Sequence, residues 1–170
     1  MQRNFLEIKS NSNAVKLADI PVIEYSEFKR EIEELFEDSS NHCLNYFAFP
    51  FQDKFKFLCF VGNDEKQNIS VYSFEKPKSE RITLDSITAK HFQFHVFERE
   101  MYENNGINFS NHPWLKPVRY PQNRFNPKSK IENYPFYSIE SDELHEVGVG
   151  PIHAGVIEPG YFRFICNGEN

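Results

Sequence analysis

The segment 97–103, FEREMYE, places charged side chains within a helical pattern of apolar residues. On a helical wheel Glu98 lies at the centre of the apolar arc. A buried carboxylate destabilises a protein unless it is paired, so we predict that Glu98 is buried and bound by a cation or by backbone donors. Arg99 and Glu103 lie one turn apart on another face. The simplest interpretation is an ion-pair network that ties the helix to the next loop; the alternatives are a proton-handling carboxylate and an intersubunit contact.

Two further segments carry titratable side chains. His112 precedes Pro113 in the loop NHPWLKP and could act as a ligand or base, although a lone loop histidine more often forms a structural hydrogen bond. His153 and Glu158 lie among glycines whose spacing matches no phosphate-binding loop. The sequence has no Ser-His-Asp set, no H-E-x-x-H and no carboxylate-rich metal motif. It therefore assigns no catalytic residue and no metal ligand.

Composition and charge exclude several classes of protein. The cysteines Cys43, Cys59 and Cys166 form no C-x-x-C pair, which indicates free thiols. The net charge is −6 and the one basic cluster is residues 124–130, so nucleic-acid binding is not expected. No apolar run approaches the ~18–20 residues of a membrane span, and the N-terminus lacks a signal core. We expect a cytoplasmic protein without direct membrane insertion.

The elements that must position these residues begin with a predicted helix, capped by Ser26 and ended by residues 39–41. Strand-like runs follow at 43–51, 54–62 and 68–76, and 81–84 could add a short fourth strand. In the second run, side chains 55, 57, 59 and 61 share one face. The pattern predicts an α+β fold, in which an antiparallel meander packs with two helices.

The second predicted helix runs from an N-cap at Ser86 to Gly106 and is apolar on two sides. Phe92 and Val96 lie opposite the main arc, and we expect the C-terminal arm or a partner chain to cover them. Residues 107–146 are predicted to form an extended, ordered arm. Its anchors are expected to be Phe109, Trp114, Leu115, Tyr134, Phe136 and Tyr137.

The run from FEREMYE to HPWLKP resembles the signature of the thirty-kilodalton subunit family of respiratory complex I, roughly E-R-E-x-x-D-x-F-G-I-x-F-x-G-H-P-x-L-R. Glu103 replaces the Asp of this signature, Asn105 its Phe and Asn111 its Gly. The resemblance covers about residues 20–121 and implies that family's α+β fold. The matching residues are Glu98, Arg99, Glu100, Gly106, Ile107, Phe109, His112, Pro113 and Leu115.

The closing run VGPIHAGVIEPGYFRF resembles the start of the large subunit of complex I-related, membrane-bound [NiFe] hydrogenases of the formate hydrogenlyase type. In complex I this segment is closer to G-P-x-H-P-A-x-H-G. Here Ala154 and Gly155 follow His153, and the tripeptide at 158–160 replaces the second histidine. In the hydrogenase branch the two domains are commonly fused. The resemblance implies a domain of the thirty-kilodalton type over 1–140 and a truncated large-subunit domain over 141–170.

The resemblance implies an accessory, docking role in a redox complex. The expected partners are the catalytic domain of the same polypeptide and the iron–sulfur small subunit, with membrane association only through the complex. A nickel–iron centre is expected in a domain that follows this chain, and no cofactor in the chain itself. The alternative is a scaffold subunit of the thirty-kilodalton type in an NADH:quinone oxidoreductase.

The tail raises a separate expectation. Residues 160–166 have the composition of a strand but no evident partner. We predict that this strand folds back onto the sheet of the domain or pairs with a second copy of the chain, with the glycines and prolines of 148–160 acting as a hinge.

Overall fold

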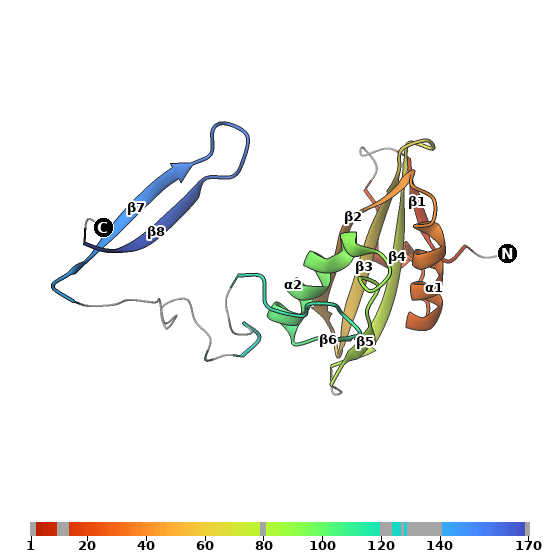
Figure 1. Cartoon of the computed structure of the whole chain (residues 1–170). Coiled ribbons are helices and arrows are strands. Elements are labelled where there is room, and N and C mark those ends of the chain that lie inside the picture. Colours follow the sequence, from red (N-terminus) through yellow and green to blue (C-terminus); the bar gives the residue numbers. More distant parts are fainter. Residues whose placement is uncertain are drawn as a thin grey trace. The chain divides into compact units, whose positions relative to one another are not determined.

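The structure is a computed structural model, which describes residues 3–9, 14–78, 81–119, 124–126, 128 and 141–168 (Figure 1). The chain separates into two compact units, Met1–Lys130 and Ile131–Asn170, and each is described by itself. The assignment of the second unit to a large-subunit domain stays a prediction.

The first unit is built on a four-stranded antiparallel sheet. Its strands are β1 (Leu6–Ile8), β2 (Asn41–Phe51), β3 (Lys54–Asn63) and β4 (Asn68–Pro77), in the order β1-β4-β3-β2. The predicted meander is confirmed. The fourth strand, however, comes from the N-terminus. The segment expected to supply it forms β5 (Thr83–Asp85), which pairs in parallel with β6 (Asn108–Ser110) in a separate small sheet.

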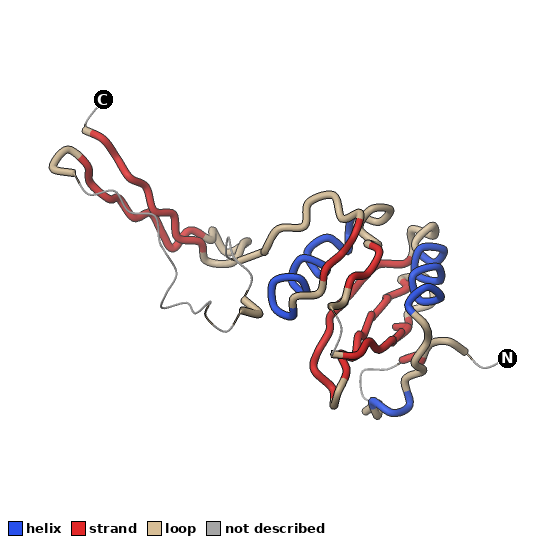
Figure 2. The backbone as a smooth tube through the Cα atoms, turned by 90° about the horizontal axis from the view of Figure 1, so that it is seen from below, coloured by secondary structure: helices blue, strands red, loops and turns tan. Residues whose placement is uncertain are grey.

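Two helices cover one face of this sheet, α1 (Tyr25–Leu35) and α2 (His95–Asn105), and in Figure 2 both lie along the same side of its strands. Two 3-10 turns, η1 (Leu17–Asp19) and η2 (Phe92–Phe94), complete the helical elements of the described residues. The α+β prediction is therefore confirmed.

The core between helices and sheet is aromatic. Phe57 and Phe74 stack with their centroids 4.1 Å apart, and Phe28 lies 4.8 Å from Phe74. All three are fully buried, and each contributes about 1.5–3 kcal/mol by leaving water. On β3, Phe57, Cys59 and Val61 face this core as predicted. Leu58 points to the opposite face, where it packs with Val71 and with Ile20, the residue after η1.

Both predicted N-caps are wrong. Helix α1 begins one residue before Ser26, because the Phe28 amide already donates to the Glu24 carbonyl at 2.9 Å. Helix α2 begins only at His95. The Ser86 amide donates instead to the Ser110 carbonyl at 2.9 Å, which holds this segment against β6 rather than in a helix.

The second unit contains a β-hairpin of β7 (Leu144–Ile152) and β8 (Gly160–Asn167), paired antiparallel. The strand at the tail is confirmed, but it pairs with β7 and not with the sheet of the first unit, as one of the two alternatives had it; pairing with a second copy stays a prediction. The first part of the supposed hinge, residues 148–152, belongs to this partner strand. The Tyr161 side chain lies across Gly148, where a Cβ would come within 2.1 Å of its hydroxyl.

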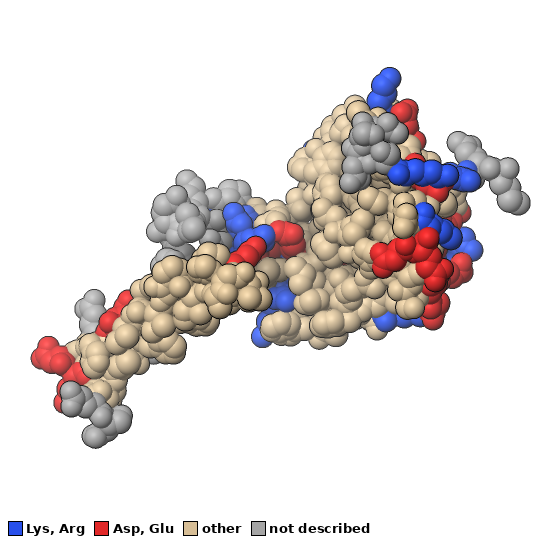
Figure 3. All heavy atoms as spheres, turned by 90° about the horizontal axis from the view of Figure 1, so that it is seen from above, with Lys and Arg blue, Asp and Glu red and all other residues tan. Residues whose placement is uncertain are grey.

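One face of the hairpin is apolar and exposed. Val147 is opposite Phe164, and Val149 is opposite Phe162, so these four side chains share a face. Each is at least 39% exposed. In Figure 3 the visible face of the hairpin is almost entirely uncharged. On the other face Arg163 pairs with Glu146 at 2.5 Å.

Candidate functional site

Glu98 is buried completely on the inner side of α2. Its carboxylate accepts four hydrogen bonds, from the Ser86 hydroxyl (2.5 Å), the Ile87 amide (2.8 Å), and the Thr88 hydroxyl (2.6 Å) and amide (3.4 Å). Burial raises the pKa of this carboxyl, and the four donors partly offset that effect. The prediction that Glu98 is buried and paired is confirmed.

A histidine completes the surroundings of Glu98. The Nε2 atom of His112 lies 3.8 Å from the Glu98 carboxylate, and both side chains are at most 1% exposed. The Nδ1 atom of His112 accepts the Trp114 amide proton at 3.0 Å. In a neutral imidazole the proton must then be on Nε2, which lies near the carboxylate but forms no hydrogen bond to it. His112 is thus a structural hydrogen-bonding group, as the simpler interpretation had it.

Arg99 and Glu103, one turn apart on α2, hold the loop that follows β6. The Arg99 guanidinium donates to the carbonyls of Lys116 (2.7 Å) and Pro117 (3.0 Å). The Glu103 carboxylate accepts from the amides of Val118 (2.5 Å) and Arg119 (2.7 Å). One cation and one anion therefore fix four successive residues by their backbones. Charge-assisted bonds of this kind are roughly twice as strong as neutral ones.

Cations surround the second oxygen of Glu103. Arg119 lies 3.7 Å and Arg124 4.0 Å from it. Arg119 also donates to Glu100 at 2.5 Å on the helix surface. These contacts match the predicted network that ties the helix to the loop.

The result of this anchoring is an exposed tryptophan. Trp114 is 56% exposed, and the Arg99 guanidinium lies 4.5 Å from the centre of its indole. Of the predicted anchors, Phe109 is buried and Leu115 packs against the core, whereas Trp114 is held at the surface. Tyr134, Phe136 and Tyr137 lie outside the described residues.

Comparison with protein families matches residues 22–136 to the respiratory-chain NADH dehydrogenase 30 Kd subunit family. This match spans more than half of the chain. The chain belongs to this family. Comparison with curated proteins finds no match.

The structure gathers most of the family signature in one place. Glu98, Arg99, Glu100, Glu103 and His112 interact with one another or with one shared loop. Gly106 ends α2 and Pro113 lies exposed in the loop. The region matched to the family therefore has α2 and its loop as its candidate functional site.

His153 and Glu158 lie in the second unit, at the turn of the hairpin. The His153 Nδ1 atom accepts the Gly155 amide proton at 3.0 Å, and both His153 and Glu158 are exposed. The structure gives them no contact with each other. Their proposed role at an interface is untested.

The sequence did not reveal three contributors to this site. Ser86 and Thr88 bind Glu98, although Ser86 was expected to cap a helix. Lys116 borders the indole, with its ammonium 5.7 Å from the ring centre. Thr88 lies in a turn after β5, so no strand or helix periodicity could reveal that it shares Glu98 with Ser86.

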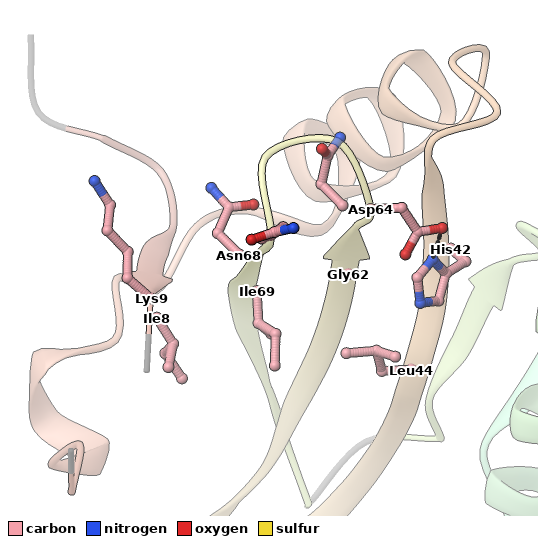
Figure 4. Close-up of a pocket in the computed structure, with 10 residues that line it drawn as sticks. Ile8, Lys9, His42, Leu44, Gly62, Asp64, Asn68 and Ile69 are labelled. Atoms are coloured by element: carbon pink, nitrogen blue, oxygen red, sulfur yellow. Dashed lines mark ion pairs between the residues drawn. The ribbon is translucent and has the colours of Figure 1, made fainter. Parts of the chain in front are cut away.

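A separate hollow of about 370 Å³ lies at one end of the sheet (Figure 4). Ile8, Leu44 and Ile69 line it, and His42 pairs with Asp64 across 3.6 Å at its rim. No signature residue lines it.

Among the described residues no cluster of His, Cys, Asp or Glu is arranged to hold a metal ion. None of the helices within the described residues combines the length and the apolar character that a membrane span needs.

The signature glycine of the family gives a first prediction. Gly106 adopts φ +69°, and an added Cβ would lie 3.1 Å from the Phe125 ring. The Gly106→Ala variant should lose about 1–2 kcal/mol of stability, because the left-handed conformation strains any residue with a Cβ. Urea denaturation measures this loss. The Gly106→Asn variant should lose less stability, since asparagine tolerates the left-handed conformation. Equal losses of stability in the two variants would show that the contact with Phe125, rather than backbone strain, is the cause.

The buried histidine predicts a pH dependence. Burial lowers the pKa of His112 in the folded chain, whereas an unfolded histidine titrates near about 6.5. Just below that pH the unfolded chain binds more protons, so the free energy of unfolding should decrease as the pH falls from about 6.5 towards the folded pKa. Chemical denaturation at several pH values measures this slope.

The matched variant is His112→Asn, whose side-chain oxygen can still accept the Trp114 amide proton. Its free energy of unfolding should depend less on pH in this window. Burial raises the pKa of Glu98, so that carboxyl acts in the opposite sense, from its usual ~4.5 up to its folded pKa. Identical slopes for the two proteins would contradict the prediction.

Proposed function

We propose that this chain is a docking domain of a membrane-bound, complex I-related [NiFe] hydrogenase. In this role it would join the catalytic domain of the same polypeptide to the iron–sulfur small subunit. The observation that carries the proposal is that charged residues of α2 bind backbone groups of neighbouring segments. Arg99 and Glu103 bind the backbone of residues 116–119 and so order the loop that carries the exposed Trp114, while Glu98 binds the segment after β5. Such a surface serves recognition.

The hydrogenase branch is supported by the sequence of residues 147–164, where Ala154, Gly155 and Glu158 stand in place of the complex I pattern. The exposed apolar face of the hairpin is consistent with a segment that packs against further protein. A cytoplasmic location, with attachment to the membrane through the complex, is part of the same proposal.

The residues of this chain do not fit the nickel–iron centre itself. That centre needs two Cys-x-x-Cys pairs, whereas Cys43, Cys59 and Cys166 lie singly on β2, β3 and β8. Cys59 is also buried in the core. Under this proposal the nickel–iron centre is held by another domain of the parent protein.

The second candidate is a scaffold subunit of the thirty-kilodalton type in an NADH:quinone oxidoreductase. The matched family is compatible with this candidate, as it is with the first. Both candidates assign the same physical task to α2 and its loop, and they differ in the neighbours that the domain would hold.

Affinity isolation of the tagged protein from detergent-solubilised membranes of its source distinguishes the two. We expect an iron–sulfur small subunit and a large-subunit domain with two Cys-x-x-Cys pairs, identified by mass spectrometry. Recovery of a flavin-containing NADH-oxidising module instead would establish the second candidate. Recovery of the chain alone, from both membrane and soluble fractions, would refute docking altogether.

A further inference from the structure

The outer side of α2 carries an exposed apolar stripe. Phe92 lies in η2 and Val96 follows it by about one turn on α2, whereas Arg99, one turn further on, is itself buried. Phe92 is 67% and Val96 40% exposed. The Arg99 side chain leads from this stripe to the indole of Trp114. We call the surface formed by Phe92, His95, Val96, Trp114 and Lys116 the α2 patch; the buried Arg99 packs against the indole within it.

The α2 patch is rigid. Phe92 stacks on His95 with the ring centres 4.3 Å apart. The backbone beneath Trp114 is fixed by the bonds from Arg99 to the carbonyls at 116 and 117. A surface that is already ordered loses little conformational entropy on binding. Tryptophan is also among the residues most enriched in those that dominate binding energies.

The charge around the α2 patch is positive, although the chain as a whole carries −6. Lys116 is exposed and forms no ion pair within the described part of the chain. The acids of α2 do not offset it, because Glu98 and Glu103 are buried on the chain's own donors and Glu100 pairs with Arg119. A complementary partner therefore presents carboxylates beside an apolar side chain.

We propose that the α2 patch docks a protein segment in which one apolar anchor lies beside one or two carboxylates. The anchor packs between Phe92 and Trp114, and a carboxylate pairs with Lys116. This inference rests on the proposed docking function and specifies the surface and the chemistry of the partner. A nucleic acid fits less well, because phosphate binding requires several free cations and the patch offers one.

The first test is photo-crosslinking in the assembled complex. A benzophenone amino acid is placed at Phe92 or Val96, with Leu44 as control, since Leu44 is 44% exposed on β2 and lies outside the patch. We expect both patch positions to crosslink the same partner, at a peptide that combines apolar and acidic residues. The Leu44 position should not crosslink that peptide.

The second test reverses one charge. Lys116→Glu should reduce the amount of partner recovered with the tagged protein by about tenfold or more, because like charges then face each other. Lys66→Glu is the matched control, on the exposed turn after β3, and should leave recovery unchanged. Changing the crosslinked carboxylate to lysine should restore recovery with Lys116→Glu.

The outcomes separate this inference from the proposed function. Suppose that the complex is recovered but the patch positions form no crosslink, or crosslink only to a nucleic acid or to a second copy of this chain. The inference about the α2 patch is then overturned, while the proposed docking function stands. Equal loss of recovery with Lys116→Glu and Lys66→Glu also overturns it. If no complex is recovered in the isolation experiment, the proposed function fails first.

Discussion

Glu98→Ala should lower the free energy of unfolding by about 3–5 kcal/mol, as expected when one partner of a buried charged group is removed. The side chain is fully buried, and its loss leaves the donors of Ser86, Ile87 and Thr88 without an acceptor. Each unsatisfied buried donor costs roughly 1–3 kcal/mol. Urea denaturation followed by circular dichroism measures the change.

Two variants control this prediction. Glu98→Gln keeps the shape and one acceptor oxygen, so only the amide that faces the Ile87 donor is mismatched, and the loss should be smaller than for alanine. Glu100→Ala removes a carboxylate from the same helix whose partner is an exposed arginine, and should cost below about 1 kcal/mol. Similar losses for Glu98→Ala and Glu100→Ala would show that the buried cluster is not stabilising.

The burial of Glu98 could be predicted because helical periodicity is local. Its position within the arc follows from the sequence alone, whatever the rest of the fold does. The donors could not be predicted in the same way. Ser86 and Thr88 reach Glu98 because the pairing of β5 with β6 holds their segment in place, and β6 lies more than twenty residues further along the chain. The same hydroxyl pattern is compatible with a helix N-cap, which is why Ser86 was misassigned.

The hairpin shows a similar limit. Strand composition identified 160–166, since aromatic and β-branched residues favour strands. Its partner β7 contains Gly148, Gly150 and Pro151, which in isolation indicate a turn or hinge. Glycine also permits close approach of a neighbouring side chain, and Tyr161 occupies that space. Only the pairing itself distinguishes the two uses of glycine.

For the candidate site, the link between Arg99, Glu103 and the next loop was predictable from their spacing, but the form of that link was not. The expected ion pairs are secondary. Both side chains chiefly bind backbone groups, and no pattern of residue types reveals the amides and carbonyls of residues 116–119 as their partners. The exposure of Trp114 follows from this backbone anchoring.

Glu103→Ala should therefore release the loop while leaving the core folded. The amides of Val118 and Arg119 lose their shared acceptor, at a cost of roughly 1–3 kcal/mol each where water cannot replace it. Trp114 is the only tryptophan of the chain, so its fluorescence anisotropy should fall in the variant. Amide hydrogen exchange should accelerate at residues 118 and 119 by far more than in the sheet.

Arg119→Ala is the matched control for that experiment. It removes the cation 3.7 Å from Glu103 and the surface pair with Glu100, but it keeps the backbone amide that Glu103 binds. Its stability should change by less than about 1 kcal/mol, with Trp114 as immobile as before. Should Arg119→Ala mobilise Trp114 as much as Glu103→Ala does, the loop would be held by side-chain charge rather than by its backbone. The rigidity of the α2 patch would then depend on salt, because exposed ion pairs are screened and amide bonds to a buried carboxylate are not.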